Sequence, residues 1–132
     1  MHKILRRLKG GLAMTLEKTP WGRSIEILVG PKEEDGRTIE SAGANYIEPK
    51  QMIPLHLHEE NSEEYIPQTE GLKILVVSKE EMEKMTALQI IDALHSLSPA
   101  EIGDVVTCPK GYAHALYNSS DSVGSFVFIK YN

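Results

Sequence analysis

The sequence predicts an all-β domain in which many short strands form a sandwich or barrel around one hydrophobic core. Strand-like runs rich in β-branched and apolar residues recur along most of the chain, with turn residues between them. The length of 132 residues is close to the commonest domain size, and 41% hydrophobic with 25% charged residues is typical of a folded protein. We therefore expect a single domain over residues 1–132.

The first half of the chain alternates strand-like runs with turns. Residues 4–14 place basic side chains beside a few apolar ones, so we expect a short helix or arm there, within an N-terminal arm over residues 1–18. The run 24–29 is a predicted strand, and Gly30 and Pro31 are expected to end it. A charged hairpin tip and a second strand are expected next, at residues 32–36 and 38–48.

The second half contains further strands and one change of pattern. The predicted strands lie at residues 54–58, 63–68, 72–77, 102–107, 114–117 and 125–131. Over residues 78–99 apolar side chains recur about every third position, which predicts a helical insert. Capping-box pairs, Ser78 with Glu81 and Thr86 with Gln89, are compatible with two short helices or with one helix interrupted near Thr86.

Charge, hydropathy and cysteine content exclude several classes of protein. The net charge is −5 and the 14 Lys and Arg residues form no long basic stripe, so nucleic acid is not an expected partner. No window reaches the roughly 18 to 20 continuous apolar residues that a membrane-spanning helix needs. The single cysteine, Cys108, excludes an intrachain disulfide and is interpreted as a small buried apolar residue; a reducing cytoplasm is the expected location.

Two histidines two residues apart carry the first chemical signal. On a strand, His56 and His58 point to the same face, and they share one coordination sphere only if further ligands come from neighbouring strands. Glu64 and His114 lie in suitable predicted strands. Imidazole with carboxylate suits divalent transition metals such as Zn, Mn, Fe, Ni and Co, which the sequence does not distinguish, whereas Ca and Mg prefer oxygen ligands.

A stretch of sixteen residues resembles the second motif of the cupins, which runs Gly, five residues, Pro, one residue, Gly, two residues, His, three residues, Asn. The matching positions, with every spacing kept, are Gly103, Pro109, Gly111, His114 and Asn118. The resemblance implies a cupin double-stranded β-helix, or jelly-roll barrel, with His114 facing inward as a metal ligand. The helical insert then lies between the two cupin motifs.

The first cupin motif runs Gly, five residues, His, one residue, His, three or four residues, Glu, six residues, Gly. His56, His58 and Gly71 stand at matching positions. Lys50 occupies the position of the first glycine, which puts the usual tight turn in question because a residue with a side chain resists positive φ.

Two neighbouring glutamates compete for the carboxylate position of this motif. Glu64 keeps the six-residue spacing to Gly71, whereas Glu63 keeps the four-residue spacing from His58. Since adjacent strand residues face opposite ways, only one of them points into the barrel unless the turn bulges. We favour Glu64, which gives the expected metal ligands His56, His58, Glu64 and His114.

A second, shorter resemblance concerns the segment Thr19-Pro20-Trp21-Gly22-Arg23. It is similar to the entry into the cupin portion of bacterial mannose-6-phosphate isomerase and mannose-1-phosphate guanylyltransferase proteins. This resemblance implies a sugar or sugar-phosphate ligand. Trp21 itself is interpreted as a packing or barrel-rim residue rather than a residue that stacks on a ligand.

The cupin resemblance covers many functions, so the expected activity is coarse. We expect a metal-dependent enzyme of the isomerase or epimerase type that acts on a small polar molecule such as a sugar or sugar phosphate. The alternatives are a non-catalytic small-molecule or carbohydrate-binding cupin and a non-haem iron dioxygenase. Tyr112, on the turn before His114, is the candidate substrate-binding residue; no catalytic residue is identified, and a homodimer is expected.

Overall fold

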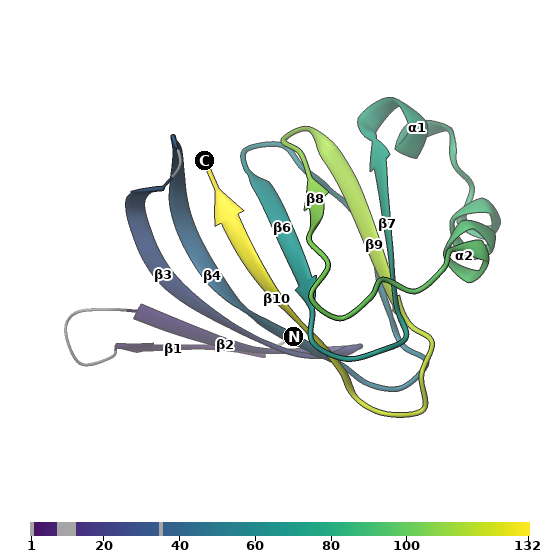
Figure 1. Cartoon of the computed structure of the whole chain (residues 1–132), viewed down its shortest axis with the longest axis horizontal. Helices are drawn as coiled ribbons and strands as arrows, with labels where there is room; N and C mark the ends of the chain where they lie inside the picture. The colour runs from purple at the N-terminus through teal and green to yellow at the C-terminus, as the bar shows by residue number, and fades with distance from the viewer. Residues whose placement is uncertain (1, 8–12, 35) are drawn as a thin grey trace.

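Two antiparallel β-sheets face each other in the computed structural model, which describes residues 2–7, 13–34 and 36–132 (Figure 1). The larger sheet has seven strands in the order β1-β2-β3-β4-β10-β6-β8, and the smaller has three in the order β5-β9-β7. The strands are β1 His2–Arg7, β2 Ala13–Thr19, β3 Gly22–Glu34, β4 Arg37–Ile47, β5 Met52–His58, β6 Ser62–Pro67, β7 Leu72–Ser78, β8 Val106–Cys108, β9 Tyr112–Asn118 and β10 Gly124–Tyr131. The predicted all-β jelly-roll class is confirmed.

The helical insert forms two short helices, α1 (Lys79–Lys84) and α2 (Ala87–Ser96), and so confirms the two-helix alternative. Both predicted capping boxes are present. The helices follow β7 and lie beside the small sheet, away from the large one (Figure 1), where the ring of His95 contacts Tyr117 at 5.0 Å. Neither described helix has the length and apolar character needed to cross a lipid bilayer.

Of the two N-terminal alternatives, the helix is wrong, because the described part of residues 1–18 is β-strand. β1 pairs with β2 as an antiparallel hairpin, and β2 pairs with β3 from Ala13↔Leu28 to Thr19↔Gly22. A short isolated helix has little stability of its own, whereas the edge of β3 offers unpaired backbone groups to a new strand. The predicted arm therefore extends the large sheet.

Two strand boundaries also differ from the predictions. β3 continues through Gly30 and Pro31, and its register with β4 shifts between Leu28 and Lys32. Proline has no N–H to donate, so a sheet tolerates it at such an irregularity. The strand expected at 102–107 is reduced to Val106–Cys108, and Ile102 is exposed.

The core lies between the sheets and takes side chains from both. Its members are Ile47, Ile53, Tyr65, Leu72, Cys108, Leu116, Phe126 and Phe128. Cys108 is fully buried, as predicted, and burial raises the pKa of its thiol to about 11. It is therefore a thiol and a packing residue at neutral pH.

The turn at Lys50 lies beside Asn118, which is fully buried and whose carbonyl oxygen accepts from the N–H of Lys50 at 2.9 Å. Its Nδ2 donates to the carbonyl oxygens of Ile47 at 2.9 Å and Ser122 at 2.8 Å, while its Oδ1 accepts from the backbone N–H of Ser120 at 3.0 Å. Lys50 adopts the positive φ, 61°, that a glycine would adopt freely, and its ammonium donates to the carbonyl of Ser119. The tight turn therefore forms although lysine stands at the glycine position of the motif.

Replacing Asn118 by alanine should lower the free energy of unfolding by about 2–4 kcal/mol, because it leaves buried carbonyl oxygens without a donor. Urea denaturation measures the loss. Asn61→Ala is the matched control, since Asn61 makes one part-buried hydrogen bond to Glu40, and should cost less than about 1 kcal/mol. Equal losses in the two variants would contradict the role given to Asn118.

Candidate metal centre

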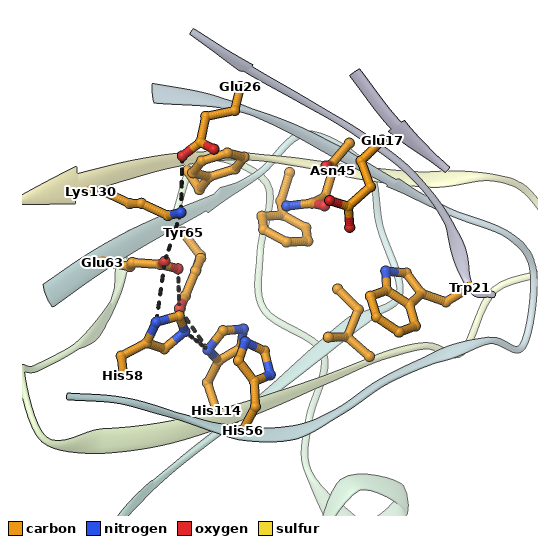
Figure 2. Close-up of a pocket in the computed structure, with 14 residues that line it drawn as sticks. Glu17, Trp21, Glu26, Asn45, His56, His58, Glu63, Tyr65, His114 and Lys130 are labelled. Atoms are coloured by element: carbon orange, nitrogen blue, oxygen red, sulfur yellow. Dashed lines mark hydrogen bonds and ion pairs between the residues drawn. The ribbon is translucent and has the colours of Figure 1, made fainter. Parts of the chain in front are cut away.

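A cavity of about 230 Å³ lies between the two sheets. Figure 2 shows three histidines at one end of it and Trp21 at the other, with Glu17 and Asn45 on the Trp21 side. The lining includes side chains from both sheets, among them Tyr65 from β6. The volume is below the roughly 300–1,000 Å³ of sites for drug-sized molecules, so the cavity suits a small ligand.

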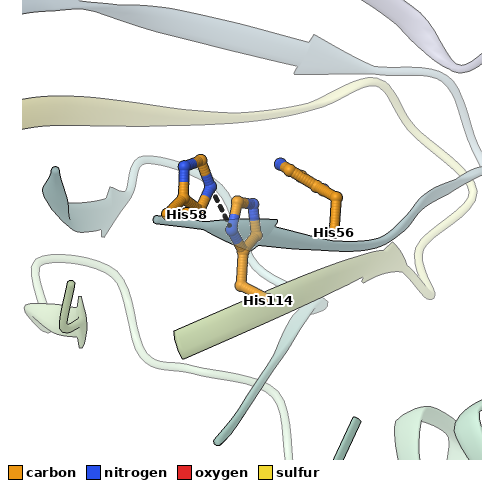
Figure 3. Close-up of side chains that lie close together, drawn as sticks. All are labelled: His56, His58 and His114. Carbon is orange, nitrogen blue, oxygen red and sulfur yellow. Dashed lines mark hydrogen bonds between the residues drawn. The ribbon is translucent and has the colours of Figure 1, made fainter. Parts of the chain in front are cut away.

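The pairing of β5 with β9 brings the three predicted histidines together. His56 and His114 are direct Cα partners across this pair, and His58 follows two residues later on the same face. One ring nitrogen from each of the three lies within 4.8 Å of the others (Figure 3). In the described part of the chain, this is the group of side chains that could hold a metal ion.

Hydrogen bonds orient each ring. Nδ1 of His56 lies 2.9 Å from the carbonyl oxygen of Pro54, which can only accept, so Nδ1 carries the proton and Nε2 keeps its lone pair. Nδ1 of His114 lies 2.7 Å from the hydroxyl of Tyr65 and 2.9 Å from Nε2 of His58. Such partners fix ring orientation in metal sites.

Burial keeps the inner two histidines uncharged at neutral pH. Desolvation, helped by the neighbouring His56 and by Lys130, lowers the pKa of His58 to about 4. Desolvation also places the pKa of His114, which is 4% exposed, well below its usual value. Since metals bind the neutral imidazole, the site is ready for a cation without losing protons first.

Of the two glutamates, Glu63 and not Glu64 faces the cavity. Glu63 is 4% exposed and lines the cavity, and its Oε1 lies 3.4 Å from Nδ1 of His58. Glu64, on the alternate face of β6, is only partly buried and does not line the cavity. Counting back from Gly71 favoured Glu64, whereas the turn 59–61 leads into β6 with Glu63 on the inner face.

Glu63 also belongs to a chain of buried polar contacts. The hydroxyl of Tyr65 donates to Oε2 of Glu63 at 2.7 Å, so its oxygen can accept from Nδ1 of His114. Desolvation raises the pKa of Glu63 against the opposing effects of Tyr65 and Lys130. Burial, with the Glu63 charge, raises the pKa of Tyr65 far above its usual value, so Tyr65 stays a proton donor.

A partly buried ion pair completes this side of the cavity. Nζ of Lys130 lies 2.9 Å from Oε2 of Glu26 and 4.0 Å from Oε1 of Glu63, and the hydroxyl of Ser41 donates to Glu26 at 2.6 Å. Desolvation lowers the pKa of Lys130, but its hydrogen bond to Glu26 and the nearby carboxylates outweigh this and raise it. Lys130 is therefore a charged partner of two carboxylates.

Several lining residues were not predicted from the sequence. Strand periodicity could have predicted two of them. Tyr65 lies two residues after Glu63 on the same face of β6, and Lys130 lies two residues after Phe128 on the same face of β10. Glu26 had no such motif to mark it. The predicted ligand-binding residue Tyr112 pairs with His58 but is 40% exposed and does not line the cavity.

Comparisons with known proteins agree with this architecture. The model of the family described as "Cupin" matches residues 31–132. A predicted oxalate decarboxylase from Thermotoga maritima is similar over 97% of this chain and 97% of its own length, with a TM-score of 0.58 and 17% identity. The CENP-C cupin domain of Drosophila melanogaster is similar over 97% of this chain and 74% of its own length, with a TM-score of 0.55 and 15% identity.

The capsular polysaccharide assembling protein CapF of Staphylococcus aureus is similar over 89% of this chain but only 28% of its own length, with a TM-score of 0.61 and 14% identity. No curated protein matches the sequence. At these identities the structural likeness shows the fold and nothing about ligands. The resemblance to mannose-phosphate enzymes therefore stays a prediction.

Acidification should destabilise the metal-free protein. A histidine whose pKa is lowered in the folded state gives stability that is present above its unfolded value and lost as the pH falls. For His58 this window runs from 6.5 down to about 4, whereas Glu63, with its raised pKa, acts in the opposite sense. Because two histidines lose stability on acidification and one glutamate gains it, we expect the melting temperature to fall as the pH is lowered from about 7 to about 5.

Differential scanning calorimetry in the presence of a chelator measures this fall. His114→Asn should make the dependence on pH shallower, because the buried ring that resists protonation is gone. His95→Asn, on α2 outside the cavity, should keep the wild-type dependence. The same slope for wild type and His114→Asn would refute the interpretation.

Proposed function

Since the chain belongs to the cupin family, we propose that it binds one divalent transition metal ion on His56, His58 and His114, with Glu63 as the fourth ligand. The observation that carries the proposal is the convergence of three imidazoles within 4.8 Å at one end of a polar cavity. Glu63 replaces Glu64 in the ligand set because its carboxylate contacts His58.

The residues fit such an ion chemically. Neutral imidazoles and one carboxylate suit Zn, Mn, Fe, Ni or Co, and a divalent ion would offset the cost of burying Glu63. The hydroxyl of Tyr65 is hydrogen-bonded to both Glu63 and His114, and such outer partners orient the ligands in metal sites. Three histidines and one carboxylate leave coordination positions for a ligand or water.

The bound molecule is proposed to be small and polar, and the reaction an isomerisation or epimerisation of a sugar or sugar phosphate. The short resemblance around Trp21 and the polar lining support this choice. When bound, the metal would polarise a carbonyl oxygen of the substrate. Of the carboxylates outside the ligand set, Glu17 lines the cavity and could accept a proton, while Glu26 holds Lys130 in place.

A non-catalytic binding cupin remains the second candidate, and a non-haem iron dioxygenase the third. The structural neighbours include a predicted oxalate decarboxylase and a CENP-C cupin bound to CAL1, so this fold is found among very different proteins. The identity of the metal and the presence of turnover distinguish the three. Tyr112 as a ligand contact, a homodimer and a cytoplasmic location stay predictions.

Purified, tag-free protein should contain about one transition metal ion per chain by plasma mass spectrometry, since four protein ligands bind such ions tightly. His114→Ala should lose it. The adjacent glutamates give a matched pair: Glu63→Gln should weaken metal binding at least about 10-fold, whereas Glu64→Gln should leave it unchanged. Wild type that takes up no metal even after reloading would refute the proposal.

Turnover can be tested without knowing the substrate. If the protein isomerises or epimerises sugars, metal-loaded protein in D₂O should exchange a carbon-bound proton of an aldose, ketose or sugar phosphate for deuterium, which proton NMR detects. Protein without metal should not catalyse this exchange. Binding of such a compound without exchange would favour the non-catalytic alternative, and iron with oxygen-dependent turnover would favour the dioxygenase.

A further inference from the structure

Trp21 has a buried donor that the fold does not use. The residue lines the cavity and packs partly against the core, yet its indole Nε1 is buried and has no hydrogen-bond partner among the described residues. Figure 2 shows the indole at the far end of the cavity from the histidines. Trp21 thus combines packing against the core with a donor that the described residues leave unpaired.

An unpaired buried N–H is costly, about 1–3 kcal/mol, and most such groups in folded proteins have a partner. The indole nitrogen can only donate, so its missing partner is an acceptor, such as a hydroxyl or carbonyl oxygen. Since the indole lines the cavity, a bound molecule can supply that oxygen.

Next to Trp21, three polar side chains form a row across the large sheet. Glu17 on β2 pairs with Ser24 on β3, and Ser24 pairs with Asn45 on β4, so all three share one face at one register. All three line the cavity. A carboxylate, a hydroxyl and an amide together offer both donors and acceptors, which suits a ligand with several hydroxyl groups.

The charges of the lining argue against an anionic ligand. Among the described residues that line the cavity, Glu17, Glu26 and Glu63 carry carboxylates and Lys130 alone carries a permanent positive charge, which Glu26 and Glu63 engage. No arginine lines this part of the structure, although arginine is the side chain best suited to carboxylates and phosphates. A divalent ion would bring the formal charge of the lining only to about zero.

We propose that the wall formed by Trp21, Glu17, Ser24 and Asn45 recognises a neutral, polyhydroxylated molecule of monosaccharide size, whose oxygen accepts a hydrogen bond from the Trp21 indole. This inference rests on the proposed function, because the histidine end of the same cavity holds the metal. It narrows the substrate class from polar molecules in general to uncharged polyols and sugars, and it places oxalate and sugar phosphates outside that class.

Trp21 is the one tryptophan of the sequence, so its indole gives a single assignable N–H signal in a ¹H–¹⁵N NMR spectrum. Metal-loaded protein is titrated with D-mannose, D-fructose, D-glucose and myo-inositol, and in parallel with mannose 6-phosphate, fructose 6-phosphate and oxalate. At least one neutral compound should shift the indole signal in a saturable way. Trp21→Phe keeps an aromatic ring but removes the N–H, so it should weaken binding of that compound about five-fold. Isothermal titration calorimetry measures the two affinities.

Asn45→Ala should weaken binding by a similar factor, whereas Tyr117→Phe, on the helix-covered side of the small sheet, should leave it unchanged. An indole signal that stays fixed with every neutral compound in the tens of millimolar, or tighter binding of the anions, would overturn the inference. Metal content is measured on the same samples. Metal present with an unresponsive indole would defeat this inference alone, whereas protein that takes up no metal would defeat the proposed function.

Discussion

The antiparallel pairing of β5 with β9 is the constraint on which the candidate site depends. It makes His56 and His114 cross-strand partners although they lie 58 residues apart in the sequence. His58, two residues after His56, adds the third ring on the same face. A shift of one residue in this register would turn the histidines of one strand away from the cavity. The Asn118 turn at the end of β9 helps to hold that register.

Burial then gives the clustered groups their chemistry. The same desolvation that keeps His58 and His114 neutral makes the charge of Glu63 costly, and the fold offsets that cost only in part with Tyr65 and Lys130. A cavity with neutral nitrogen ligands and an incompletely compensated carboxylate favours a cation. Electrostatics and geometry thus point to the same end of the cavity.

Fixed spacings made the fold and three of the four proposed ligands predictable, because each depends on a local rule. The two capping boxes and the histidine alternation are of this kind. Which of Glu63 and Glu64 faces the cavity depends on how many residues the turn 59–61 uses, and the spacing to Gly71 does not report this. Trp21, Glu26 and Lys130 line one cavity through long-range strand order, which a single sequence does not encode locally.

The helical insert has a consequence for how this barrel could vary. α1 and α2 each satisfy their first backbone groups with their own capping residues, Ser78 and Thr86, and they lie beside the small sheet rather than against the cavity. They still depend on the barrel for stability, since Leu94 of α2 is fully buried and Lys73 of β7 donates to the carbonyl oxygen of His95, but these contacts lie outside the cavity. Relatives could lengthen, shorten or exchange this decoration, and so acquire new binding surfaces, while the chemistry inside the barrel stays untouched.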